Sequence, residues 1–99
     1  MLSHSDIKYA TMDGIATGQT LRAARHALGW SIHDLAKKSG VSVRTILRYE
    51  SIDDVPPSRG GNLEKLRKTL EAAGIEFIGS PDDAPGIRIH PRPDQMSHD

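Results

Sequence analysis

The sequence predicts a mainly α-helical domain of four helices, followed by a C-terminal β-hairpin or a strand that pairs within a dimer. Three observations support this fold class. Apolar residues recur at helical spacing as far as Gly74, a glycine separates two short helices within residues 32–51, and apolar and polar residues alternate after residue 75. The 99 residues, 36% of them hydrophobic, are enough for one small core and not for two domains.

The first predicted helix begins at Thr17 or Gly18, either of which can cap it, and ends at Gly29. Trp30 is expected to pack in the core at the corner that follows. One stripe of this helix carries Leu21, Ala24, Arg25 and Leu28. Residues 1–16 show no sustained periodicity, so they are expected to form a flexible tail, within which Met12 is an alternative start to Met1.

Residues 32–51 are predicted to form two helices joined by a tight turn. Ala36 lies where the helices cross, and its small side chain lets the backbones approach. Gly40 follows the first helix, where the chain must turn through a left-handed conformation that glycine adopts without cost. Ser31 and Ser42 are good N-caps for the two helices. Val41 in the turn, and Ile46 and Tyr49 in the second helix, are expected to face the core. This pattern is a helix-turn-helix.

A fourth helix is predicted after a loop over residues 51–61, in which two adjacent prolines forbid a continuous helix. Asn62 is expected to cap this helix and Gly74 to end it. Its apolar ridge consists of Leu63, Leu66 and Leu70. The helical domain is therefore expected to span residues 17–74.

Residues 75–79 and 86–90 alternate apolar with polar side chains, which predicts two strands. The segment between them contains prolines and aspartates, and it predicts a loop longer than two residues. An isolated pair of strands is marginally stable. Either the hairpin packs on the helices, or its edge pairs with the same strand of a second subunit. The side chains concerned are Ile75, Phe77, Ile87 and Ile89. Residues 91–99 are expected to be disordered.

The net charge of zero conceals an uneven distribution along the chain. Residues 19–74 hold ten Lys or Arg against six Asp or Glu, which gives +4; residues 1–18 hold one against two, and residues 75–99 hold two against five. One window of residues 37–48 contains no acid and four cations. They are Lys37, Lys38, Arg44 and Arg48. This clustering is typical of a surface that meets phosphates.

Residues Gln19 to Gly74 resemble the Cro and lambda-repressor-like (XRE-type) helix-turn-helix regulators. The resemblance rests on LRAARHALGWS at residues 21–31, DLAKKSGVS at residues 34–42 and TILRYE at residues 45–50. It implies a four-helix, lambda-repressor-like domain that binds double-stranded DNA. It also implies a structural ion pair between Arg25 in the first helix and Glu50 at the end of the recognition helix. Arg25 is therefore expected to support the fold and not to contact DNA.

The resemblance places the helix from Ser42 to Glu50 in the major groove, with Arg44 as the best candidate for contacting guanine. Arg48 is expected to contact another guanine or a phosphate, and Thr45 a phosphate. The two apolar positions on this face, Val43 and Leu47, can contact thymine methyl groups; the alternative for Leu47 is packing against the following loop. Further predicted interface residues are Lys37, Lys38, Ser31 and Ser42. Ile32 stands where the family often has a phosphate-binding glutamine.

Other classes of function find little support in the sequence. There is no cysteine, the five histidines are scattered, and no nucleophile motif or phosphate loop occurs. We expect no enzyme activity, no metal and no cofactor. No apolar run approaches the roughly 20 residues that span a bilayer, so a cytoplasmic, nucleoid-associated protein is expected.

The function expected from these features is a sequence-specific transcriptional regulator, acting as a homodimeric repressor. Dimer pairing by residues 75–90 is favoured, because DNA half-sites usually require a two-fold dimer. Two alternatives remain open. One is an antitoxin that uses the same motif on DNA and binds a toxin partner. The other is a protein-interaction adaptor on the same fold, which Ile32 and Val43 favour.

Overall fold

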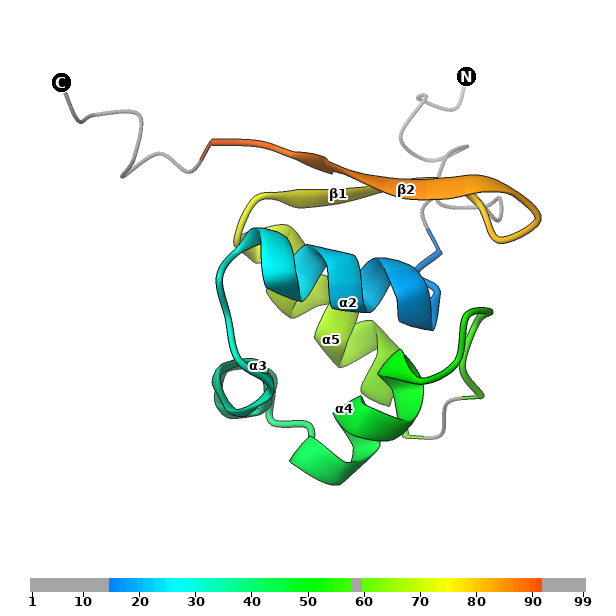
Figure 1. Cartoon of the computed structure of the whole chain (residues 1–99). Coiled ribbons are helices and arrows are strands. Elements are labelled where there is room, and N and C mark those ends of the chain that lie inside the picture. The colour runs from blue at the N-terminus through cyan, green and yellow to red at the C-terminus, as the bar shows by residue number, and fades with distance from the viewer. Residues whose placement is uncertain (1–14, 58–59, 92–99) are drawn as a thin grey trace, which may run out of the picture.

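The computed structural model describes residues 15–57 and 60–91. Its elements are α2 (Gly18–Ala27), α3 (Ile32–Ser39), α4 (Val43–Glu50), α5 (Asn62–Ala72), β1 (Ile75–Ser80) and β2 (Asp83–Ile89) (Figure 1). Four helices followed by an antiparallel hairpin confirm the predicted fold class. Most of the two predicted tails, including Met12, lies outside the described residues.

Helix α2 begins with a complete capping box. The Thr17 hydroxyl accepts a hydrogen bond from the Thr20 amide, and the Thr20 hydroxyl accepts one from the Thr17 amide. Ala16 precedes this cap and is 1% exposed, packed in the same cluster as Leu21. The prediction that the flexible tail extends to residue 16 is therefore wrong at its last position. A small apolar residue before an N-cap packs against the fourth helical residue, and Ala16 and Leu21 occupy those positions.

The turn between α3 and α4 has the geometry that the sequence predicted. Gly40 ends α3 with φ 78°, in the left-handed region. The Ser42 hydroxyl then accepts a hydrogen bond from the Thr45 amide and caps α4. The inward side chains of this segment are buried: Val41, Ile46 and Tyr49. Ala36 packs against the core at the crossing of the two helices.

Helix α5 begins at Asn62, the residue that was predicted to cap it. Its N-cap is Gly61, with φ 75°, and no side chain bonds the first turn. Asn62 is already helical, so its amide side chain cannot accept from the amides ahead of it in the manner of an N-cap. Leu66 and Leu70 are fully buried, as expected for the face that closes the core.

The hairpin is tighter than predicted. β1 and β2 pair from Ile75 with Ile89 to Ser80 with Asp83, which leaves only Pro81 and Asp82 as the connection. A register shift between Ile78 and Ser80 accommodates Ala84 and Pro85 within β2 as a bulge. Proline lacks an amide hydrogen, and a bulge is a place where a strand tolerates it. The prediction of a longer loop was therefore wrong.

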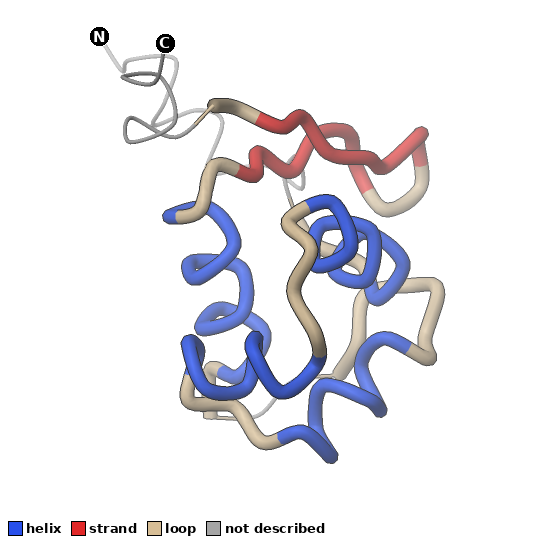
Figure 2. Tube along the Cα trace, turned by 60° about the vertical axis from the view of Figure 1, so that its left-hand side comes forward, coloured by secondary structure: helices blue, strands red, loops and turns tan. Residues whose placement is uncertain are grey.

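The hairpin forms a layer across α2 and α5, while α3 and α4 lie on the opposite side of these two helices (Figures 1 and 2). Ile75 and Phe77 of β1 are buried against the helices, and Ile87 of β2 is partly buried. Packing on the helices, one of the two alternatives, is thus present, but Ile89 does not share in it and is 57% exposed. None of the helices within the described residues is long and apolar enough to cross a membrane.

Candidate nucleic-acid interface

The face of α4 that points away from the core carries the predicted recognition residues. Arg44, Leu47 and Arg48 are exposed, while Val43 and Thr45 are half-buried at its edges. Leu47 is 53% exposed, so about half of its side chain is open to solvent on this face. An exposed leucine between two arginines leaves a surface with both apolar and cationic groups.

Arg44 lies in the first turn of α4, one turn before Arg48. Among residues 15–57 and 60–91, no hydrogen bond or ion pair engages its guanidinium. The Ser42 hydroxyl donates to Thr45 Oγ1 at 3.0 Å, so the Thr45 hydroxyl keeps its own hydrogen for an external acceptor. The start of the helix therefore offers donors that the fold does not consume.

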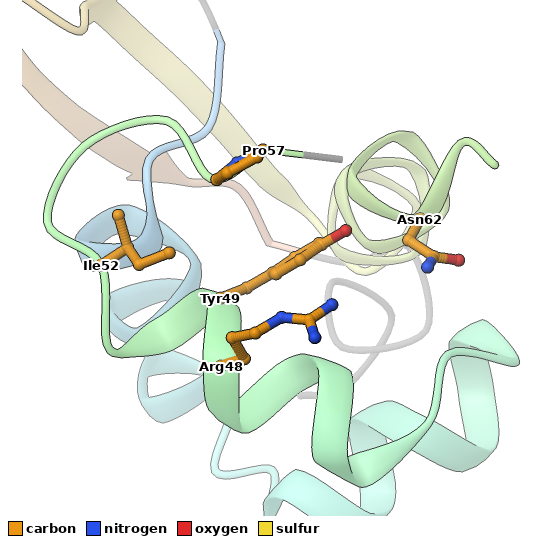
Figure 3. A pocket seen from close by; sticks show the side chains of 5 residues that line it. All are labelled: Arg48, Tyr49, Ile52, Pro57 and Asn62. Atoms are coloured by element: carbon orange, nitrogen blue, oxygen red, sulfur yellow. The ribbon is translucent and has the colours of Figure 1, made fainter. Parts of the chain in front are cut away.

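Arg48 is held at the side of α4 by its neighbour. Its guanidinium carbon lies 5.8 Å from the centroid of the Tyr49 ring, a cation–π distance. Together with Ile52, Pro57 and Asn62, these two side chains line a hollow between the C-terminal end of α4 and the start of α5 (Figure 3). Arg48 therefore points toward α5 and lies at the rim of the exposed face.

The lysines of α3 differ in their surroundings, although both are exposed. The Lys38 ammonium lies 5.0 Å from the centroid of the Trp30 ring. Trp30 and Lys38 also line a depression with Lys68 of α5, so Trp30 is only partly buried and not a full core residue. No ring contact or ion pair holds Lys37 among the described residues. Of the two lysines, Lys37 is the less constrained.

Arg25 and Glu50 form the ion pair that the resemblance implied. Arg25 Nε lies 2.8 Å from Glu50 Oε2, and Arg25 Nη2 lies 2.8 Å from Glu50 Oε1, so the contact is bidentate. The two side chains are only 9% and 6% exposed. The hydrogen bonds that Arg25 donates to Glu50 are the main reason that the pKa of Arg25 is raised above its ordinary value. Arg25 Nη1 also donates to the Trp30 carbonyl, which ties the turn before α3 to the end of α4.

Two further residues that position α4 were missed by sequence reasoning. Arg22 Nη1 donates to the Glu50 carbonyl at 2.8 Å, which satisfies an orphan acceptor at the end of the helix. Gly18 lies against the same helix end: a Cβ atom added there would overlap the main-chain oxygens of Tyr49 and Ile52. The sequence held a weak indication of the role of Arg22. It lies three residues before Arg25, and residues at this spacing project toward one side of a helix. For Gly18, only the contact itself identifies the role.

Ser31 caps α3 in a reciprocal arrangement with Asp34. The Ser31 hydroxyl accepts from the Asp34 amide, and Asp34 Oδ2 accepts from the Ser31 amide at 2.9 Å. That backbone hydrogen bond is the largest reason that the pKa of Asp34 lies below its ordinary value. The Ser31 hydroxyl is thus engaged in capping. Ile32, which follows, is partly buried and packs against the core.

Among residues 15–57 and 60–91, no group of three His, Cys, Asp or Glu side chains is placed so that it could hold a metal ion. The surface around α4 combines exposed cations, an apolar side chain and the hydroxyl of Thr45, which keeps its hydrogen for an external acceptor. These are the groups that bind phosphates and the edges of bases in a major groove.

A family model described as helix-turn-helix matches residues 21–58. A protein of Archaeoglobus fulgidus assigned as an HTH-type transcriptional regulatory protein is 35% identical over 60 residues. That alignment covers 61% of this chain and 19% of the Archaeoglobus protein, so the chain spans about a fifth of the length of this relative. No solved structure matches the chain significantly. The motif, the helices of the described residues and these matches agree that residues 21–58 are similar to the helix-turn-helix of DNA-binding regulators.

Proposed function

We propose that the chain is a sequence-specific DNA-binding regulator that inserts α4 into the major groove and acts in the cytoplasm as a homodimeric repressor. One observation carries the proposal: α4 presents Arg44, Leu47 and Arg48 to solvent while its opposite face is buried in the core. Bound across a promoter, such a protein would repress transcription by excluding the polymerase.

The roles of the side chains follow from their surroundings. Arg44 is the only one of the two α4 arginines without a ring contact among the described residues, so its planar guanidinium is assigned to the two acceptors of a guanine. Arg48, stacked on Tyr49 at the rim, is assigned to a phosphate. Leu47 and Val43 are assigned to thymine methyl groups, and Thr45 to a phosphate. Lys37 and Lys38 are also assigned to phosphates. The same role is assigned to Ser31 and Ser42, which cap the starts of α3 and α4.

Replacing Arg44 with alanine should lower affinity for the preferred sequence by about 1–3 kcal/mol and leave affinity for unrelated DNA almost unchanged. The reason is that a bidentate contact with guanine exists only on the preferred site. Lys37→Ala is the matched control, since it removes a cation from the same domain. It should weaken binding to all sequences alike and reduce the slope of log affinity against log salt by about 1.

Binding isotherms of both variants on preferred and unrelated duplexes, at several salt concentrations, measure the difference. If Arg44→Ala and Lys37→Ala weakened every duplex to the same extent, the assignment of Arg44 to base recognition would be wrong. The chain would then bind DNA through its positive charge, without recognising a base sequence through Arg44.

A further inference from the structure

The last two residues of β2 and the residue that follows them are exposed. The side chains of Arg88 and His90 are 60% and 52% exposed, and Ile89 is 57% exposed. By contrast, Ile75 and Phe77 of β1 are buried. An exposed strand edge that carries an apolar residue is a template for pairing with another strand.

The hydrogen-bond pattern of the hairpin fixes which main-chain groups face outward. The His90 amide donates to the Gly74 carbonyl at 2.7 Å, and Glu76 lies opposite Arg88 in the same register. In an antiparallel pair, hydrogen-bonded positions alternate along the strand. Because residues 86, 88 and 90 bond inward to β1, the amides and carbonyls of Ile87 and Ile89 point away from the hairpin.

Two prolines limit this outward edge. Pro91 takes the next outward position after Ile89, and Pro85 precedes Gly86 at the bulge on the other side of this segment. Neither has an amide hydrogen. Outward pairing is therefore confined to the segment between them, and Pro85 and Pro91 are equidistant in sequence from Arg88.

We propose that a second copy of this chain pairs with β2 along this edge, antiparallel and with the two-fold axis at Arg88; the inference rests on the proposed function, which calls for a dimer. In this register Ile87 of each copy exchanges main-chain hydrogen bonds with Ile89 of the other. Pro85 falls opposite Pro91, so the two missing amide hydrogens face each other and every isoleucine amide and carbonyl on this edge keeps a partner. Moving the axis to Ile87 or Ile89 places a proline opposite an isoleucine, so the carbonyl of that isoleucine loses its donor and Ile87 no longer faces Ile89.

The side chains fit this register as well. Ile87 and Ile89 lie on the face of the hairpin that holds Ile75 and Phe77, so pairing sets Ile89 against Ile87 of the second copy and covers an exposed apolar residue. The two Arg88 side chains become neighbours on the other face. Each has its own counter-ion, because Arg88 Nη1 lies 3.2 Å from Glu76 Oε1 within its hairpin.

The resulting dimer has the geometry that DNA requires. A two-fold axis between paired edge strands is perpendicular to the sheet, so the helices of both copies lie on the same side of one four-stranded sheet. α3 and α4 lie at the far side of the helical layer from the hairpin (Figures 1 and 2). Both recognition helices would thus face the same way, as contact with two half-sites on one face of DNA demands.

Cysteine cross-linking of the full chain tests the register, since the natural sequence contains no cysteine. Arg88→Cys should form an intermolecular disulfide on mild oxidation, because residues opposite each other in a non-hydrogen-bonded pair lie within disulfide distance. His90→Cys is the matched control. Its two copies are offset by about 13 Å along the strands, beyond the reach of a disulfide. No cross-link at residue 88, or equal cross-linking at residues 88 and 90, would overturn the proposed register.

Ile89→Lys tests the interface without a cysteine. Ile89 is mostly exposed in the single chain, so the substitution should leave the melting temperature of the monomer unchanged. The mass measured by light scattering should fall from that of two chains to that of one chain, 10.8 kDa. Ile89→Val should keep the dimer. A wild-type chain of monomer mass, or an Ile89→Lys variant of dimer mass, would refute the interface. If the dimer is absent but the chain still binds DNA sequence-specifically, the interface alone is refuted. If residue 88 cross-links but the chain does not bind DNA, the proposed function alone is refuted.

Discussion

Replacing Glu50 with methionine is expected to lower the free energy of unfolding by about 3–5 kcal/mol, and Arg25→Met should cost a similar amount. Each substitution leaves the other charge buried without its counter-ion, in a contact where both side chains are less than a tenth exposed. Small domains have only about 5–15 kcal/mol of stability in total. The single variants should therefore be largely unfolded well below the melting temperature of the natural chain.

The double variant Arg25→Met/Glu50→Met is expected to be more stable than either single variant, because it leaves no buried charge unpaired. Denaturant unfolding of the four proteins gives the coupling energy directly. A matched control is Glu64→Met, which breaks the pair between Glu64 and Arg67 on the surface of α5. Exposure and solvent screening limit that loss to about 1 kcal/mol or less. Additive effects at Arg25 and Glu50 would contradict the account of the buried pair.

Gly18→Ala is expected to destabilise the fold by about 3 kcal/mol, although alanine normally favours a helix. The added methyl group would overlap the main-chain oxygens of Tyr49 and Ile52, which cannot rotate away as a side chain would. The amide of Gly18 also donates to the Asp54 carbonyl at 3.0 Å, so relief of the overlap would stretch this bond. The start of α2 would have to separate from the end of α4.

Gln19→Ala is the control for Gly18→Ala, since Gln19 is the adjacent residue of the same helix and is exposed. It should change stability by no more than about 0.5 kcal/mol. Chemical denaturation of both variants measures the difference. Equal stability of Gly18→Ala and the natural chain would show that the contact with α4 has room for a side chain.

Local patterns predicted those features that short stretches of sequence determine. Ser31, Gly40 and Ser42 act within one helical turn of their own positions, and the structure shows them as predicted. The pair between Arg25 and Glu50 spans distant residues, and it was reached through the family resemblance and not through spacing. Residue chemistry and resemblance together thus gave the framework of the domain.

The features that were mispredicted depend on contacts made elsewhere in the fold. Asn62 has the composition of a cap, but Gly61 takes the cap position. Pro85 suggested a loop, yet a bulge places it within β2. The contact of Gly18 with α4 and the position of Lys38 over Trp30 join segments that only the tertiary structure brings together. Secondary-structure propensity depends on a residue and its neighbours in sequence. It contains no information about residues that only the tertiary structure brings close.

Recognition of DNA sequence by α4 can be measured by selecting bound duplexes from a random DNA pool with the full chain. We predict one enriched motif that contains guanine at the Arg44 position of each half-site and thymine nearby, arranged as a palindrome with about 10 base pairs between half-site centres. The same selection with Arg44→Ala should lose the guanine. A pool without enrichment would contradict sequence-specific recognition by α4 and would favour a protein-interaction adaptor on the same fold.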